Sequence, residues 1–440
     1  MAKDAQGHEL TGASAEAAAA YDKAIRAFTL SYGDTLAAFD EARNQAPACA
    51  MAQLGKAWVF ALANDAVLVT GARPLMDAAR ALPMNEREQT HLAALEHAVE
   101  GRRASANAIL DPHLMHHPLD LLGHYAAMLL DAFQGRFANV RDRSARAMPL
   151  WRPSMPGYGI MLSLYGFGLE EAGNYTQAED ISRAAAELEP YGYWPHHAVS
   201  HVLEMTGRPA EGLEWMDART PFWSGKDNAS RTHIWWHKAL FHVELGQYDE
   251  ALALYDGPIA ESQRPTGISL TNGSALLWRL EMLGYDAGSR WKDLDKLWAG
   301  HADGHLCLFA DLHAAMAAIR AGHGTELDRV HAAMRSTASG HGEFASAYRD
   351  IGLPVLEALI AFDRRDYADA VAKLLASRAH LWRIGGSHAQ RDVIEWTLNE
   401  ASARAGMKDI AIALANERLA LRPESRPNRR FLQNAEAVAN

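Results

Sequence analysis

The chain has 440 residues, 49% hydrophobic and 22% charged, which is the balance of a folded protein and excludes a largely disordered one. Its 43 Lys and Arg face 54 Asp and Glu, and the formal charge of −11 excludes a general attraction to phosphate backbones. Two cysteines, Cys49 and Cys307, exclude a disulfide framework and a cysteine-rich zinc site.

The N-terminal segment lacks the apolar core of a secretory signal. The longest apolar stretch, residues 57–69, is interrupted by Asn64 and Asp65 and is too short to span a bilayer. We therefore expect a cytoplasmic protein with neither a membrane nor a nucleic-acid partner.

Residues 1–118 are expected to form less regular helical repeats. Phe39, Ala42 and Pro47 fit the end of a second repeat helix, and residues 54–58 fit the first helix of the next repeat. Four prolines then interrupt the pattern: Pro74, Pro83, Pro112 and Pro118. The histidines of this stretch, His113, His116 and His117, are expected in a loop with solvated imidazoles, as are His301 and His305 further along.

Residues 119–422 carry a regular repeat, marked by a glycine after each apolar helical stretch. These glycines are Gly135, Gly173, Gly207, Gly246, Gly284 and Gly322, at spacings of 38, 34, 39, 38 and 38 residues. Gly406 follows 84 residues after Gly322, and Arg365-Asp-Tyr-Ala-Asp-Ala stands near the middle of that interval without its glycine. Within residues 173–190, small Ala185 permits close helix packing and Pro190 ends the helix.

A two-helix unit of about 34 residues is the period of the tetratricopeptide repeat (TPR). The sequence therefore predicts an all-α fold, a TPR-type helical-hairpin solenoid (an α-α superhelix). We expect one continuous array over residues 1–440, with residues 423–440 as an extended C-terminal cap or a fraying tail.

The first helix of each TPR hairpin lines the concave surface, so counting back from the turn glycines identifies the inward side chains. They include His197, His201, Glu204, His233, Trp236, Trp278 and Glu281, with His237 and His313 beside them. Peptide-binding repeats commonly place Lys, Arg and Asn at these positions. A lining of His, Trp and Glu instead suits a small polar or aromatic ligand, a metal ion or proton transfer.

His197 and His201 are four residues apart, on one helical face, with Glu204 one turn later. Two imidazoles at this spacing can share a divalent metal ion, and His233 or His237 could supply a third ligand. The alternative is a polar, partly buried surface in which histidines bond to glutamates of neighbouring repeats. His201, Glu204 and His237 are also the candidates for acid–base catalysis.

Residues 232–242 hold three histidines and two tryptophans. Here Trp235 is expected in the core and Trp236 in the groove. Further along, Ser387 and Gln390 fit a capping box, for which a structural role is sufficient. Glycines before a helix N-terminus, with His388 and Arg391 alongside, also suit an anionic ligand.

Several of these segments resemble the tetratricopeptide repeat protein 38 family, including its StaR-like bacterial members. The resemblance rests on His197-x3-His201-Val-Leu-Glu204, His233-x-Trp235-Trp236-His237, Leu276-Leu-Trp278-Arg279 and Gly385-Gly-Ser-His388. It implies a cytosolic, all-helical repeat protein and transfers no catalytic residue.

Three functions fit this pattern. The groove could bind a small molecule or a short peptide, could be the active site of a metal-dependent or His/Glu acid–base enzyme, or could be incidental to a protein–protein scaffold. The ligand-binding candidates are His197, His233, Trp236, Trp278, Glu281, His313, His388 and Arg391. The metal candidates are His197, His201 and His233, and the sequence leaves a homo-oligomer open.

Overall fold

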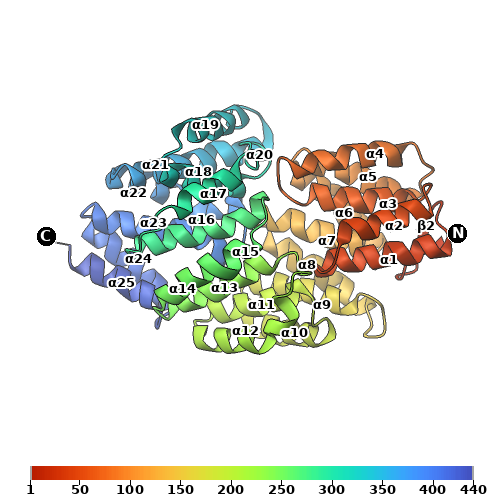
Figure 1. Ribbon diagram of the computed structural model, residues 1–440, viewed down its shortest axis with the longest axis horizontal. Helices are drawn as coiled ribbons and strands as arrows, with labels where there is room; N and C mark the ends of the chain where they lie inside the picture. The colour runs from red at the N-terminus through yellow and green to blue at the C-terminus, as the bar shows by residue number, and fades with distance from the viewer. Residues whose placement is uncertain (1, 439–440) are drawn as a thin grey trace. The chain divides into compact units, whose positions relative to one another are not determined.

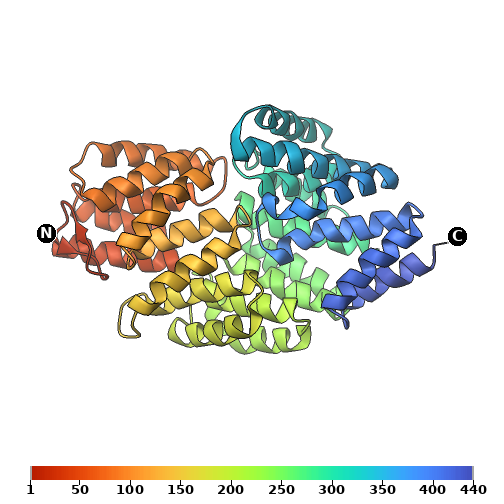
Figure 2. The ribbon, with the colours of Figure 1, turned by 180° about the vertical axis from the view of Figure 1, so that it is seen from behind.

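The computed structural model describes residues 2–438, which fold almost wholly into helices (Figure 1, Figure 2). The chain divides into two compact units, Met1–Val199 with Thr220–Arg231, and Ser200–Arg219 with Thr232–Asn440. Helix α11 (Tyr193–Met205) begins in the first unit and ends in the second, and α12 (Pro209–Trp223) runs the opposite way.

The first unit opens with a two-stranded antiparallel ladder, in which Ala2 pairs with Leu10 and Lys3 with Glu9. Its elements before α11 are β1 (Ala2–Lys3), β2 (Glu9–Leu10), α1 (Ala15–Leu30), α2 (Thr35–Gln45), α3 (Ala50–Ala61), α4 (Ala72–Arg80), α5 (Glu86–Ala98), α6 (Arg103–His116), α7 (Leu121–Ala132), α8 (Phe137–Ala147), α9 (Tyr158–Glu171) and α10 (Tyr175–Leu188).

The second unit continues with helices that pair along the chain, α16 with α17, α18 with α19, α21 with α22 and α23 with α24. Its elements after α12 are α13 (Arg231–Glu244), α14 (Tyr248–Leu254), α15 (Ala260–Ser262), α16 (Gly267–Met282), α17 (Arg290–Trp298), α18 (Leu308–Ala321), α19 (Gly324–Ala338), α20 (Gly342–Ala347), α21 (Leu353–Asp363), α22 (Tyr367–Ser377), α23 (His388–Arg404), α24 (Lys408–Leu421) and α25 (Arg426–Glu436).

The turn glycines lie between paired helices, as their spacing predicts. Gly173, between α9 and α10, has φ +82° and donates its N–H to Glu170, while Asn174 donates to Leu169. A left-handed residue closes a helix in this way and turns the chain into the next helix. The predicted all-α, TPR-type hairpin fold is confirmed. Arg365 occupies the same place in the turn between α21 and α22, with φ +65°.

Close packing inside the hairpins depends on the small residues that the sequence supplies. Ala178 and Ala185 of α10 are completely buried. A Cβ on Gly168 of α9 would lie 2.6 Å from the backbone nitrogen of Arg141 in α8. Any larger side chain at position 168 would force these two helices apart, so the glycine sets their separation.

Two segments are more regular than the sequence suggests. Pro74 lies in the first turn of α4, where a missing N–H has no partner to lose. Pro112 lies inside α6, so the expected loop around His113 is wrong. Residues 426–436 form α25, whose Phe431 and Ala435 are buried, so this part of the tail is neither extended nor frayed.

The second unit closes its C-terminal helices onto α16. The indole N–H of Trp278 donates to the hydroxyl of Thr397 in α23 at 3.0 Å. Arg279 donates to the carbonyl of Ala389 at 2.8 Å. Helix α23 therefore covers the face of α16 that the repeat register assigns to the concave surface.

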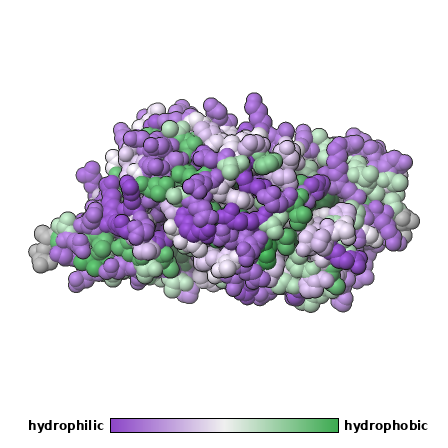
Figure 3. Space-filling view, turned by 90° about the horizontal axis from the view of Figure 1, so that it is seen from below, coloured by the Kyte–Doolittle hydropathy of each residue, from purple (hydrophilic) through white to green (hydrophobic). Residues whose placement is uncertain are grey.

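The face of the molecule in Figure 3 is mostly hydrophilic, with small apolar patches interspersed among the polar residues. Among residues 2–438, no helix has both the length and the apolar character needed to cross a membrane.

Candidate functional site

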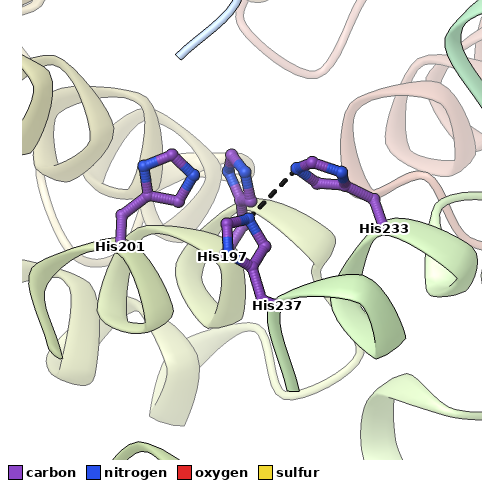
Figure 4. Close-up of side chains that lie close together, drawn as sticks. All are labelled: His197, His201, His233 and His237. Carbon is purple, nitrogen blue, oxygen red and sulfur yellow. Dashed lines mark hydrogen bonds between the residues drawn. The ribbon is translucent and has the colours of Figure 1, made fainter. Parts of the chain in front are cut away.

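Three histidines meet inside the second unit, and we call them the imidazole cluster: His201 of α11, and His233 and His237 of α13. Each offers a ring nitrogen within 4.8 Å of the others. His233 and His237 lie one turn apart on α13, so their rings project from one helical face, as Figure 4 shows. The rings of His201 and His237 are 4.6 Å apart between centroids. His201 and His237 are completely buried, and His233 is partly exposed.

Hydrogen bonds fix how His233 presents its ring. The Asn272 amide nitrogen donates to the carbonyl of Ser269 at 2.9 Å, which turns the amide oxygen toward His233. That oxygen lies 2.6 Å from Nδ1 of His233. An amide oxygen only accepts hydrogen bonds, so Nδ1 carries the proton. Nε2 of the neutral ring then carries a lone pair.

His237 is held in the same way. Its Nδ1 lies 3.3 Å from Oε2 of Glu204, and when that carboxylate is ionised it accepts a hydrogen bond from Nδ1. Nε2 of His237 then also presents a lone pair, 3.1 Å from Nε2 of His233 (dashed line in Figure 4). Two lone pairs at this distance repel each other unless a proton or a metal ion lies between them.

Burial sets the charge state of the cluster. It lowers the pKa of His233 to about 4, although the Asn272 hydrogen bond opposes the shift. Burial and the nearby His201 hold the pKa of His237 well below its usual range. Both imidazoles are therefore neutral at pH 7, the form that binds metals. Burial also raises the pKa of Glu204 to about 7, against the attraction of Arg422.

Behind Glu204 lies a buried group of charges that we call the arginine network: Arg418, Arg422, Glu244 and Asp392. Arg422 lies 3.2 Å from Glu244, 3.0 Å from Asp392 and 4.0 Å from Glu204. Arg418 adds a bidentate pair with Asp392, at 2.5 and 2.8 Å. Burial alone would raise the pKa of Asp392, but the two guanidinium groups hold it far below its usual range.

Aromatic rings complete the surroundings. His233 stacks on Trp236 with a centroid distance of 5.1 Å and an interplanar angle of 16°. The guanidinium of Arg279 lies 5.7 Å from the ring of Trp236 and 5.7 Å from that of Trp396. Trp236 is completely buried, whereas Trp235 is partly exposed beside Lys238, so the expected core position of Trp235 is wrong.

The other predicted site residues have further partners of their own. His197 precedes His201 by one turn of α11 and is assigned to the first unit, where it stacks on Tyr193 with a centroid distance of 4.8 Å. His313 is buried and its Nδ1 donates to the carbonyl of Phe309 at 2.8 Å. Trp278 and Glu281 line a pocket with Arg320 and Arg404.

At the start of α23, the capping box of Ser387 and Gln390 is present as predicted. His388 is exposed, and the buried Arg391 donates to the carbonyl of Gly386. His388 and Arg391 stay predicted contacts of an anionic ligand.

Sequence reasoning missed a second histidine cluster, in the first unit. Asp120 accepts from the Nε2 atoms of His91 and His113 at 2.9 and 3.0 Å, and from Arg87 at 2.8 Å. The other ring nitrogen of His91 accepts the indole N–H of Trp58 at 3.0 Å. Both nitrogens of His91 are thus engaged within the protein, which makes this cluster a structural hydrogen-bond network. The expectation that His113 is solvated is wrong.

No protein-family model matches the chain. Solved structures with a similar course of the chain include the human IFIT1 dimer with m7Gppp-AAAA, at 13% identity and a TM-score of 0.40, covering 95% of this chain and 94% of that one. The APC/C hetero-tetramer Cut9–Hcn1 is similar at 14% identity and a TM-score of 0.42, covering 99% of this chain and 78% of that one.

Proposed function

We propose that this TPR-type helical repeat protein binds a divalent transition metal ion through His201, His233 and His237, and that the bound ion holds a small ligand. The observation that carries the proposal is the 3.1 Å approach of the Nε2 atoms of His233 and His237, each on a ring whose Nδ1 faces an oxygen acceptor.

The spacing of these atoms supports a shared ion. Zinc–imidazole bonds of about 2.0–2.1 Å at a tetrahedral angle separate two nitrogens by roughly 3.3 Å. The observed 3.1 Å is close to this value without any movement of the helices. Metal-bound histidines also typically donate their other N–H to a carboxylate or carbonyl oxygen, which is the role of Glu204 and Asn272 here.

The donor set favours zinc, copper, nickel or iron over magnesium and calcium, because imidazole nitrogen suits the former group and oxygen ligands suit the latter. Three imidazoles leave one tetrahedral position for a water or a small ligand. His197, one turn before His201 on α11, stays the further ligand that the sequence predicts.

Under this proposal His201 and His237 hold the ion, and Glu204 positions His237 rather than acting as an acid or a base itself. The segments that carry the resemblance to the tetratricopeptide repeat protein 38 family include all three histidines. An enzyme and a protein–protein scaffold stay the alternatives from the sequence. A scaffold has no need of a metal, so metal retention is the first discriminator.

The test uses the full chain, stripped with a chelator and titrated with Zn²⁺ or Co²⁺. We expect one ion per chain and, with Co²⁺, the visible absorption of a tetrahedral site. His237→Ala should weaken binding at least about 100-fold, and Asn272→Ala, which only loses an orienting contact, about 10- to 100-fold. His341→Ala changes an exposed histidine outside the cluster and should bind like the wild type.

Absence of metal uptake by the wild-type chain would refute the proposal. Equal affinity in wild type and in folded His201→Ala and His237→Ala variants would refute it as well. Circular dichroism of each variant establishes that it is folded before its affinity is compared.

A further inference from the structure

The pocket that Trp278 and Glu281 line has a volume of about 180 Å³ and opens among helices α16, α18, α21, α22 and α23; we call it the arginine pocket. Its lining combines aromatic rings, guanidinium groups and two carboxylates: Trp278, Glu281, Met282, Arg320, Phe362, Asp363, Arg365, Tyr367 and Arg404. This volume suits a single ring or a short chain carrying one polar group.

Two of the three arginines are committed to carboxylates. Arg320 donates to Glu281 at 2.7 Å and to Asp363 at 2.6 Å. Arg404 donates to Glu400 at 2.8 Å, and its guanidinium lies 5.3 Å from the ring of Phe362 and 5.6 Å from that of Tyr367. These contacts build a fixed wall that is both cationic and aromatic.

Arg365 differs from the other two. Its side chain is exposed at the pocket, and among the side chains that the structure describes, which leave out Glu343, no carboxylate forms an ion pair with its guanidinium. Arginine presents a planar fork of donors that matches carboxylate and phosphate oxygens. Arg365 is therefore the group in this pocket that can still take up an oxyanion.

The backbone conformation of Arg365 independently indicates a function at this position. Its φ of +65° lies in the left-handed region, and it closes the turn through N–H groups of Arg365 and Asp366 that donate to Phe362 and Ala361. The same turn is made by glycine at Gly173, Gly207, Gly246, Gly284, Gly322 and Gly406, with φ between +70° and +93°. A residue with a Cβ is strained in this conformation, and such strain is typical of functional positions.

We infer that Arg365 takes the place of a turn glycine because its guanidinium binds a ligand, and that the arginine pocket binds a small organic oxyanion, a carboxylate or a phosphate ester, with an apolar part. The oxyanion pairs with Arg365 while the apolar part packs against Phe362 and Tyr367. This inference is independent of the metal proposed at the imidazole cluster.

The turn offers a well-controlled experiment, because Arg365→Gly introduces the residue that the corresponding turns of the other repeats use. That change removes the guanidinium and relieves the backbone together. We expect Arg365→Gly to melt at the same temperature as the wild type or higher, while its affinity for the anion falls about tenfold or more. Arg365→Lys keeps the charge but loses the fork, and should bind with intermediate affinity.

Calorimetric titration with phenyl phosphate, benzoate and neutral benzyl alcohol tests the chemistry. Tighter binding of phenyl phosphate assigns a phosphate ester, tighter binding of benzoate assigns a carboxylate, and either result supports the inference if benzyl alcohol binds far more weakly. Arg364→Ala, which removes the exposed neighbouring arginine outside the pocket, is the matched control and should bind like the wild type. Failure of both anions to bind at millimolar concentration, or unchanged affinity in Arg365→Gly, would overturn the inference.

Discussion

Loss of the Arg422 guanidinium should weaken the second unit strongly. It stands at the end of α24, buried, with its guanidinium 3.2 Å from Glu244 of α13 and 3.0 Å from Asp392 of α23. Arg422→Met keeps much of the side-chain volume and removes the charge. The variant therefore isolates the electrostatic part of the contact among these three helices.

The two carboxylates are affected differently. Asp392 keeps its bidentate pair with Arg418 and stays compensated. Glu244, which is 8% exposed, loses the guanidinium that faces it. Leaving one buried charge without its partner costs about 3–5 kcal/mol. In a unit of this size that corresponds to a fall in melting temperature of roughly 6–20 °C.

Urea unfolding followed by tryptophan fluorescence measures the loss, and hydrogen exchange locates it. We expect faster amide exchange in α23, α24 and α25 of Arg422→Met. The double variant Arg422→Met with Glu244→Gln removes the stranded charge and should recover about half of the lost stability. A loss below about 1 kcal/mol in Arg422→Met, or a double variant less stable than Arg422→Met, would refute the reasoning.

Two further predictions concern buried carboxylates. Asp120→Asn should lower the stability of the first unit by about 3–5 kcal/mol, because Asp120 is the common acceptor for Arg87, His91 and His113; thermal unfolding measures this, and a change under about 1 kcal/mol contradicts it. The second prediction concerns Asp311, whose ionised form destabilises the folded state. Burial raises its pKa to about 7 despite hydrogen bonds from Tyr348 and Gly304. A raised acid pKa favours the folded state at low pH, so its contribution is lost as pH rises from about 4 to 7, by up to about 4 kcal/mol. Asp311→Asn should remove that part of the pH dependence between about pH 4 and 7, and identical pH profiles for variant and wild type would contradict the assignment.

The fold was predictable because its determinants are local. Turn glycines such as Gly173 must adopt a left-handed conformation, and small residues such as Ala185 must sit where helices touch. Both requirements place glycine and small residues at regular intervals in the sequence. The proline-rich stretch was misread because α6 continues through Pro112 to His116. The predicted single continuous array stays a prediction.

The site was predictable only in part. Counting from Gly207 and Gly246 selects His201, Glu204 and His233, which the structure places together in the second unit. Asn272 and Arg422 escaped notice because they reach the cluster from helices far along the chain. No local pattern indicates such distant partners. Arg365 did leave a signal, as the one turn of the regular series without a glycine.

The contact between Arg422 and Glu244 joins residues 178 positions apart. In most repeat proteins each hairpin packs on the one before it, so the array can fold as the chain is synthesised. Here α13 and α16 lack their partners α23 and α24 until those two later helices have been made. The second unit therefore cannot complete its folding before α24 has been synthesised, and deletion of α24 should affect α13 as strongly as the helices next to α24.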